Sequence, residues 1–190
     1  MKRRDLLRGA LSGLPLLCVA RITTAADATW LPTPVVPDAH LVDQSGREVA
    51  ARTLLTRGPV AVNFMFAGCS TVCPPQTALL LAALQRMQQE PGLRGVRAVS
   101  ITVTPALDAP AQLREYAARH RLPAAPRWSL LTGDASEVER VARPFGVDLA
   151  RPADHPAQLW LGDATRDRWT RISSLAAPID VVATFRRLLA

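Results

Sequence analysis

Two cysteines, Cys69 and Cys73, are the residues of this chain whose type and spacing most clearly predict chemistry. They enclose three residues in the segment Cys-Ser-Thr-Val-Cys-Pro, and the chain has only one further cysteine, Cys18. Two sulfur atoms this close in sequence can form a disulfide or together hold a soft metal ion. A disulfide that closes so short a loop stabilises a fold by only about 2 kcal/mol in the loop-entropy model. We therefore expect a redox or metal-binding role in preference to a stabilising disulfide.

The cysteine pair is predicted to lie where a buried strand ends and a helix begins. Residues 60–66 form a continuous apolar run with β-branched and aromatic side chains, which is typical of a strand covered on both faces. Residues 75–89 carry leucines at a helical period, and prolines are tolerated in the first turn of a helix. Because a helix N-terminus favours negative charge, we expect both thiols to be more acidic than a free cysteine.

The rest of residues 38–190 alternates between predicted strands and helices. After an N-terminal β-hairpin that opens at residues 40–47, we expect strands at 96–103, 128–131, 158–162 and 169–172 and helices at 110–121, 135–145 and 177–189. This order predicts an α/β protein with a central mixed β-sheet and helices on both faces. A dithiol between a buried strand and a helix is the arrangement of thioredoxin-like proteins, so we expect a thioredoxin-like fold.

The N-terminus is predicted to be an export signal. Residues 1–28 begin with Met-Lys-Arg-Arg, continue with a short apolar stretch and end in small residues suited to cleavage. Their segment Arg-Arg-Asp-Leu-Leu-Arg is similar to a twin-arginine export motif. Cys18 would be removed with this signal, and the Pro-rich residues 29–37 form an extended arm before the domain. Export implies a periplasmic location, with an uncleaved, membrane-tethering signal as the alternative.

The formal net charge of +7 does not indicate a nucleic-acid partner. Part of the excess belongs to the predicted signal, and the remaining arginines are scattered among carboxylates without a basic stripe interleaved with aromatic residues. We expect no nucleic-acid partner, and an acidic protein partner stays open.

A metal site would need a third ligand, and the chain offers three histidines. His40 in the first predicted strand and His120 in the last turn of a helix each have an ordinary structural interpretation. His155 lies in the loop before residues 158–162, and in a thioredoxin-like fold this loop passes beside the redox helix. The spacing alone leaves open whether His155 is a ligand. Two thiolates bind Cu(I) preferentially, and an added histidine allows the site to bind Cu(II) as well. Zinc would require a fourth ligand, for which we see no candidate.

Taken together, these motifs resemble the SCO/SenC family of copper chaperones. The resemblance covers about residues 38–189 and rests on the cysteine motif with the distant pair Asp154-His155, supported by the segments 40–46, 62–66, 108–110, 131–133 and 145–147. It implies that Cys69, Cys73 and His155 bind copper as Cu(I) or Cu(II). The chain departs from the family at Thr104, where many members carry an acidic residue.

The resemblance also implies a function and partners. The protein would deliver copper to a cuproprotein, or prepare its thiols, and the implied client is a cytochrome c oxidase subunit with its dinuclear copper centre. A copper donor or a thiol reductant would act upstream, and membrane contact would come only through the client or an uncleaved signal.

Two other functions stay open. A thiol–disulfide oxidoreductase would use Cys69 and Cys73 as a catalytic redox pair and would not need His155. A peroxidase-like protein would use one peroxide-reactive cysteine of low pKa. Copper delivery is the preferred hypothesis because His155 is not required for simple thiol exchange.

Overall fold

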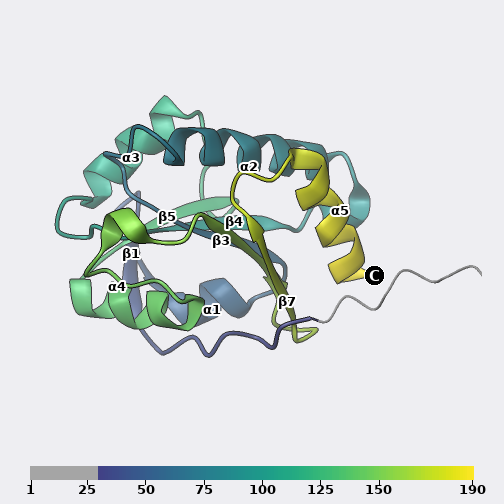
Figure 1. Cartoon of the computed structure of the whole chain (residues 1–190), viewed down its shortest axis with the longest axis horizontal. Helices are drawn as coiled ribbons and strands as arrows, with labels where there is room; N and C mark the ends of the chain where they lie inside the picture. The colour runs from purple at the N-terminus through teal and green to yellow at the C-terminus, as the bar shows by residue number, and fades with distance from the viewer. Residues whose placement is uncertain (1–29) are drawn as a thin grey trace, which may run out of the picture.

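The structure, a computed structural model, describes residues 30–190 and builds them around a mixed seven-stranded sheet (Figure 1). The strand order is β2-β1-β5-β4-β3-β6-β7, with β3, β4 and β5 parallel and the remaining neighbours antiparallel. The strands are β1 (His40–Asp43), β2 (Glu48–Ala50), β3 (Val60–Met65), β4 (Arg97–Thr102), β5 (Trp128–Thr132), β6 (Gln158–Asp163) and β7 (Arg168–Ser173). The predicted mixed sheet and the N-terminal hairpin of β1 and β2 are confirmed. The predicted export signal, residues 1–28, lies outside the described residues.

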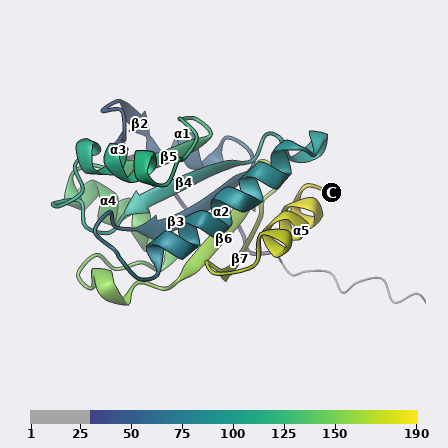
Figure 2. The same ribbon diagram turned by 90° about the horizontal axis from the view of Figure 1, so that it is seen from above.

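Helices cover both faces of this sheet, as predicted: α2, α3 and α5 lie on one face and α1 and α4 on the other (Figure 1). Seen from above, α2 runs beside α5 across the sheet (Figure 2). The helices are α1 (Ala51–Thr56), α2 (Cys73–Gln88), α3 (Pro110–Arg119), α4 (Ala135–Ala142) and α5 (Pro178–Leu189), with short 3-10 helices η1 (Pro91–Leu93), η2 (Arg143–Phe145) and η3 (Pro152–Asp154). Between residues 30 and 190, no helix has both the length and the apolar character that a membrane span requires.

Each face of the sheet packs its own apolar core. All six residues of β3 are buried, because helices cover both sides of the strand. Leu84 and Phe185 join the core under α2 and α5, whereas Leu55 and Val138 join the core under α1 and α4. This double cover fixes the end of β3 and therefore the point from which the cysteine segment leaves the sheet.

Three differences from the sequence-based expectation have a clear physical reason, and the other predicted elements differ by one or two residues at their ends. α2 begins at Cys73, two residues before the predicted start. The prolines that follow Cys73 fit in the first turn because the N–H groups of that turn have no acceptor within the helix. The predicted helix 135–145 ends as an α-helix at Ala142, and Pro144 lies in the 3-10 turn η2 that follows. Helix α1 was not predicted, since a six-residue helix shows too little periodicity.

The Pro-rich arm packs along the outer strand of the sheet. Leu31 and Trp169 exchange backbone hydrogen bonds of 2.7 and 3.0 Å, and the Thr33 N–H and hydroxyl donate to Asp167. Val36, at 4% exposure, is part of the core under α4. These contacts attach the described part of the arm to the domain.

Candidate functional site

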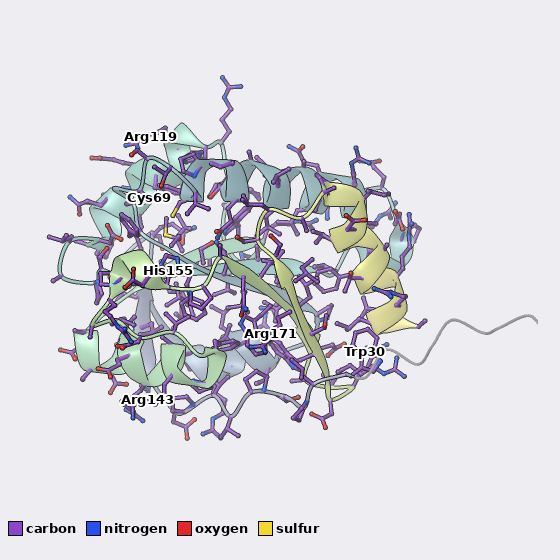
Figure 3. The ribbon with its side chains drawn as sticks, in the orientation of Figure 1. Trp30, Cys69, Arg119, Arg143, His155 and Arg171 are labelled. Atoms are coloured by element: carbon purple, nitrogen blue, oxygen red, sulfur yellow. The ribbon has the colours of Figure 1, made fainter. Side chains whose placement is uncertain are left out.

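Cys69 and Cys73 lie together where β3 leads into α2, and Figure 3 labels Cys69. The Cys69 N–H donates to the Phe66 carbonyl at 3.1 Å and closes a turn directly after β3. Cys73 is the first residue of α2, and its N–H donates to the Cys69 sulfur at 3.3 Å. Both thiols are free in this structure. The prediction that the two sulfurs share a strand–helix junction is therefore confirmed.

The two thiols differ in exposure and in acidity. Burial acts to raise the pKa of Cys69, but hydrogen bonds from the Cys73 thiol and N–H and from Thr71 outweigh it and lower the pKa to about 7. Burial raises the pKa of Cys73 to about 12, and the nearby Cys69 and Asp108 act in the same direction. Cys69 retains 8% exposure and Cys73 none. The expectation of an acidic thiol is confirmed for Cys69 and wrong for Cys73, because burial of Cys73 outweighs the effect of the helix N-terminus.

We expect iodoacetamide to modify Cys69 and to spare Cys73 in the reduced, folded protein. The thiolate is the reactive form, so the rate at Cys69 should rise with pH around its pKa of about 7 and level off above it. Peptide mass spectrometry resolves the two sites, and urea-unfolded protein, in which both should react, is the control. The prediction would be contradicted if the modification rate at Cys69 had its pH midpoint near the free-thiol pKa of about 8.5, or if both cysteines were labelled equally.

His155 directly follows η3, in the loop that leads to β6. Its Nδ1 lies 2.6 Å from the Pro152 carbonyl oxygen and its Nε2 3.2 Å from the Phe64 carbonyl oxygen. The side-chain amide of Gln76, one turn into α2, also donates to the Phe64 carbonyl, at 3.4 Å. The loop, the end of β3 and the start of α2 therefore meet at one carbonyl group, and Figure 3 shows His155 at the same end of the molecule as Cys69.

The three predicted ligands do not form a closed metal site in this structure. Within residues 30–190, no three His, Cys, Asp or Glu side chains are grouped so that they could hold a metal ion. A neutral imidazole carries one N–H and can donate to only one of the two carbonyls that it faces. Of the two contacts, the one made by Nδ1 is the shorter.

The structure accounts for the other two histidines by local contacts. His40 is exposed and pairs with Glu48, with 2.6 Å between Nδ1 and the carboxylate. His120 ends α3 and stacks on Tyr116, with 4.3 Å between ring centroids. Burial and the neighbouring Arg119 lower the pKa of His120, so it is not the cation that its place at the helix C-terminus suggested.

Asp108 is a site residue that sequence reasoning missed. It lies in the loop before α3, is 3% exposed, and accepts a hydrogen bond from the N–H of Ala67, two residues before Cys69. The motif Asp-Ala-Pro at the start of a helix has an ordinary interpretation as a helix boundary, which gave no reason to place Asp108 beside the cysteines.

A dithiol at the junction of a buried parallel strand and a helix, in a mixed sheet covered on both faces, defines a thioredoxin-like protein. Within that class, the SCO1/SenC family model matches residues 29–190, and the chain belongs to this family.

Individual relatives agree with this assignment. The SCO1 protein homolog of Bacillus subtilis (strain 168) is 35% identical over 113 residues, which is 58% of this chain and 56% of that protein, so the match spans about half of the relative's length. Yeast Sco1 with copper bound superposes with a TM-score of 0.65 at 24% identity, covering 82% of this chain and 90% of that chain. BsSco, described as a member of the Sco family of cytochrome c oxidase assembly proteins, gives 0.68 at 23% identity, covering 86% and 96%. These two structural likenesses show the shared fold.

Proposed function

We propose that this protein binds copper through Cys69, Cys73 and His155 and delivers it to a cuproprotein. The observation that carries the proposal is the pair of adjacent free thiols, joined by the Cys73 N–H to Cys69 sulfur contact, with a histidine in the neighbouring loop. Thiolates are soft ligands that select Cu(I), and an imidazole extends the set to Cu(II). The donor set therefore suits a copper cargo that can change oxidation state.

His155 would join the site by a movement of its ring. In the copper-bound protein the Nδ1 N–H would donate to the Pro152 carbonyl, a contact of the kind that orients a metal-binding histidine, and Nε2 would be the ligand atom. Nε2 faces the Phe64 carbonyl and would turn from it toward the sulfurs when copper binds.

The client that we propose is a cytochrome c oxidase subunit that carries the dinuclear copper centre. Support comes from membership of the SCO1/SenC family and from the fold shared with BsSco, a member of the Sco family of cytochrome c oxidase assembly proteins. Copper bound to yeast Sco1 supports the choice of metal. An upstream copper donor or a thiol reductant would prepare the site, and the predicted signal in residues 1–28 supports action in the periplasm.

Replacement of His155 by alanine tests the three-ligand set. We expect the reduced wild-type protein to bind one copper per chain, and the His155→Ala variant to keep Cu(I) on the two thiolates but to lose most of the thiolate-to-Cu(II) charge-transfer absorption. His120→Ala is the matched control and should bind both oxidation states like the wild type. A Cu(II) spectrum unchanged by His155→Ala would remove this residue from the ligand set.

The difference between the two thiols supports a second candidate function, thiol–disulfide exchange. The Cys69 thiolate would attack one sulfur of a partner disulfide, forming a mixed disulfide and releasing the other partner sulfur as a thiolate. Cys73, after losing its proton, would then attack the Cys69 sulfur, form the Cys69–Cys73 disulfide and release the second partner thiolate. Replacement of His155 distinguishes the two functions, because thiol–disulfide exchange should proceed at the wild-type rate in the His155→Ala variant.

A further inference from the structure

The turn that carries Cys69 has one backbone donor that the turn itself does not use. The Phe66 carbonyl accepts the Cys69 N–H, so residues 66–69 form a β-turn in which Ala67 is the second residue. The N–H of this residue has no acceptor within such a turn, and a backbone donor shielded from water needs a partner. Asp108 supplies it, since the Ala67 N–H donates to Asp108 Oδ2 at 3.1 Å.

Asp108 is in turn held by the end of β4. The same Oδ2 atom accepts hydrogen bonds from the hydroxyl of Thr102 at 2.5 Å and from that of Thr104 at 3.0 Å. The Thr104 N–H donates to the Thr102 hydroxyl at 3.0 Å, which closes the group. Hydrogen bonds to a charged oxygen are shorter and stronger than neutral ones. The carboxylate therefore ties Ala67 firmly to the last residue of β4.

Phe66 and Ala67 pack against the core under α2, but this packing covers only part of the turn. Phe66, Ala67 and Gly68 border a cavity of about 360 Å³ that Asp108 also lines, so one side of the turn faces open space. The hydrogen bond from Ala67 is the contact that restrains the turn on this side. Because Cys69 closes the turn, its position depends on the same restraint.

We propose that Asp108 is a positioning residue that holds the Cys69 sulfur beside Cys73 by anchoring the Ala67 N–H. It acts through the turn, and either proposed function needs the sulfur spacing that it maintains. The proposal is tested by the affinity for Cu(I) and by the redox potential of the two cysteines. Only the first test rests on the proposed copper binding, since the potential can be measured without metal.

Two substitutions distinguish a role of Asp108 in anchoring the turn from an effect of its negative charge on the cysteines. Asp108→Asn removes the charge and keeps an oxygen that can accept the Ala67 N–H, whereas Asp108→Ala removes both. Anchoring predicts that Asp108→Ala weakens Cu(I) affinity by about 10-fold or more, as losses of ligand-orienting groups do, and that Asp108→Asn stays close to the wild type. A role through charge alone predicts tighter Cu(I) binding in both variants, because removal of a nearby negative charge favours two thiolates.

Asp163→Ala is the matched control. Asp163 is also fully buried, at the far end of β6 from His155, and its carboxylate accepts from the Thr165 N–H and hydroxyl and from Arg166 at 2.7–2.9 Å. Its replacement should lower the free energy of unfolding, as any loss of a bonded buried carboxylate does, and should leave both readouts at the dithiol unchanged.

The measurements are Cu(I) affinity by chelator competition and the midpoint potential of the Cys69–Cys73 couple in glutathione buffers. A loosened turn disfavours the disulfide, so Asp108→Ala should raise the potential by about 30 mV for each tenfold loss in disulfide stability, and by more than Asp108→Asn. Equal effects of the two Asp108 variants on both readouts, or no effect of either, would overturn the proposal. Failure of the wild type to bind copper would reject the proposed function and leave the potential as the test of Asp108.

Thr104→Val keeps the proposal testable if Asp108→Ala does not fold. This variant removes one hydrogen bond to Asp108 Oδ2 and leaves the carboxylate in place. A smaller change in the same direction in both readouts supports anchoring, and wild-type values in both contradict it.

Discussion

Replacement of Cys73 by serine is expected to abolish stable Cu(I) binding while the fold is retained. Serine is well tolerated at the start of a helix, and it is close in size to the fully buried cysteine. Its hydroxyl is a hard donor that keeps its proton at neutral pH and is a poor ligand for Cu(I). The variant retains a single thiolate, Cys69, and should lose its copper to a chelator that the wild type withstands.

The control for this prediction uses the other sulfur atoms of the domain. Met65 and Met87 are buried in the core beneath α2, at 1% and 0% exposure, and their replacement by leucine conserves volume. Metal analysis after the chelator challenge should find copper in Met65→Leu and Met87→Leu and none in Cys73→Ser. Copper retained by Cys73→Ser, with an unchanged circular dichroism spectrum, would refute the paired-thiolate site.

Replacement of Gly162 by alanine is expected to have the largest effect on the fold. Gly162 on β6 lies opposite Trp169 on β7, and a Cβ built at Gly162 would lie 1.9 Å from an indole carbon of this tryptophan. Trp169 is fully buried and packs edge-on against Phe145, so the indole has little room to move. Overpacking of this kind costs about 1–3 kcal/mol in the free energy of unfolding. Urea unfolding followed by tryptophan fluorescence measures it.

Gly95→Ala distinguishes overpacking from a general effect of alanine for glycine. No atom lies within 4 Å of a Cβ built at Gly95, and its backbone is not in the left-handed region. We expect this substitution to change the free energy of unfolding by less than about 0.5 kcal/mol, as surface substitutions usually do. Equal stability of the two variants would show that the indole moves aside without cost.

The asymmetry of the dithiol has a consequence for both proposed functions. Cys69 retains 8% exposure and has the lowered pKa, whereas Cys73 has no exposed surface. Copper transfer and disulfide exchange would therefore both begin at Cys69, with Cys73 as the second sulfur to release the metal or to resolve the mixed disulfide.

The strands and helices around the site were predictable because their signals are local. The apolar run of β3 indicates a buried strand, and the leucine period of α2 indicates a helix with one buried face. Together they placed the cysteines at a strand–helix junction. The order of such elements was enough to predict a mixed sheet covered on both faces, and the cysteine spacing was enough to predict a redox or metal role.

The properties that decide the chemistry of the site depend on packing between distant segments. The raised pKa of Cys73 arises mainly from its burial in the packed domain, whereas the lowered pKa of Cys69 comes from hydrogen bonds with its near neighbours Cys73 and Thr71. The sequence by itself determined the thioredoxin-like architecture and the pair of thiols, because periodicity and spacing lie within single elements. Only the tertiary structure decided that Asp108 anchors the turn and that His155 faces the Phe64 carbonyl, because the partners of these side chains are 41 and 91 residues away along the chain.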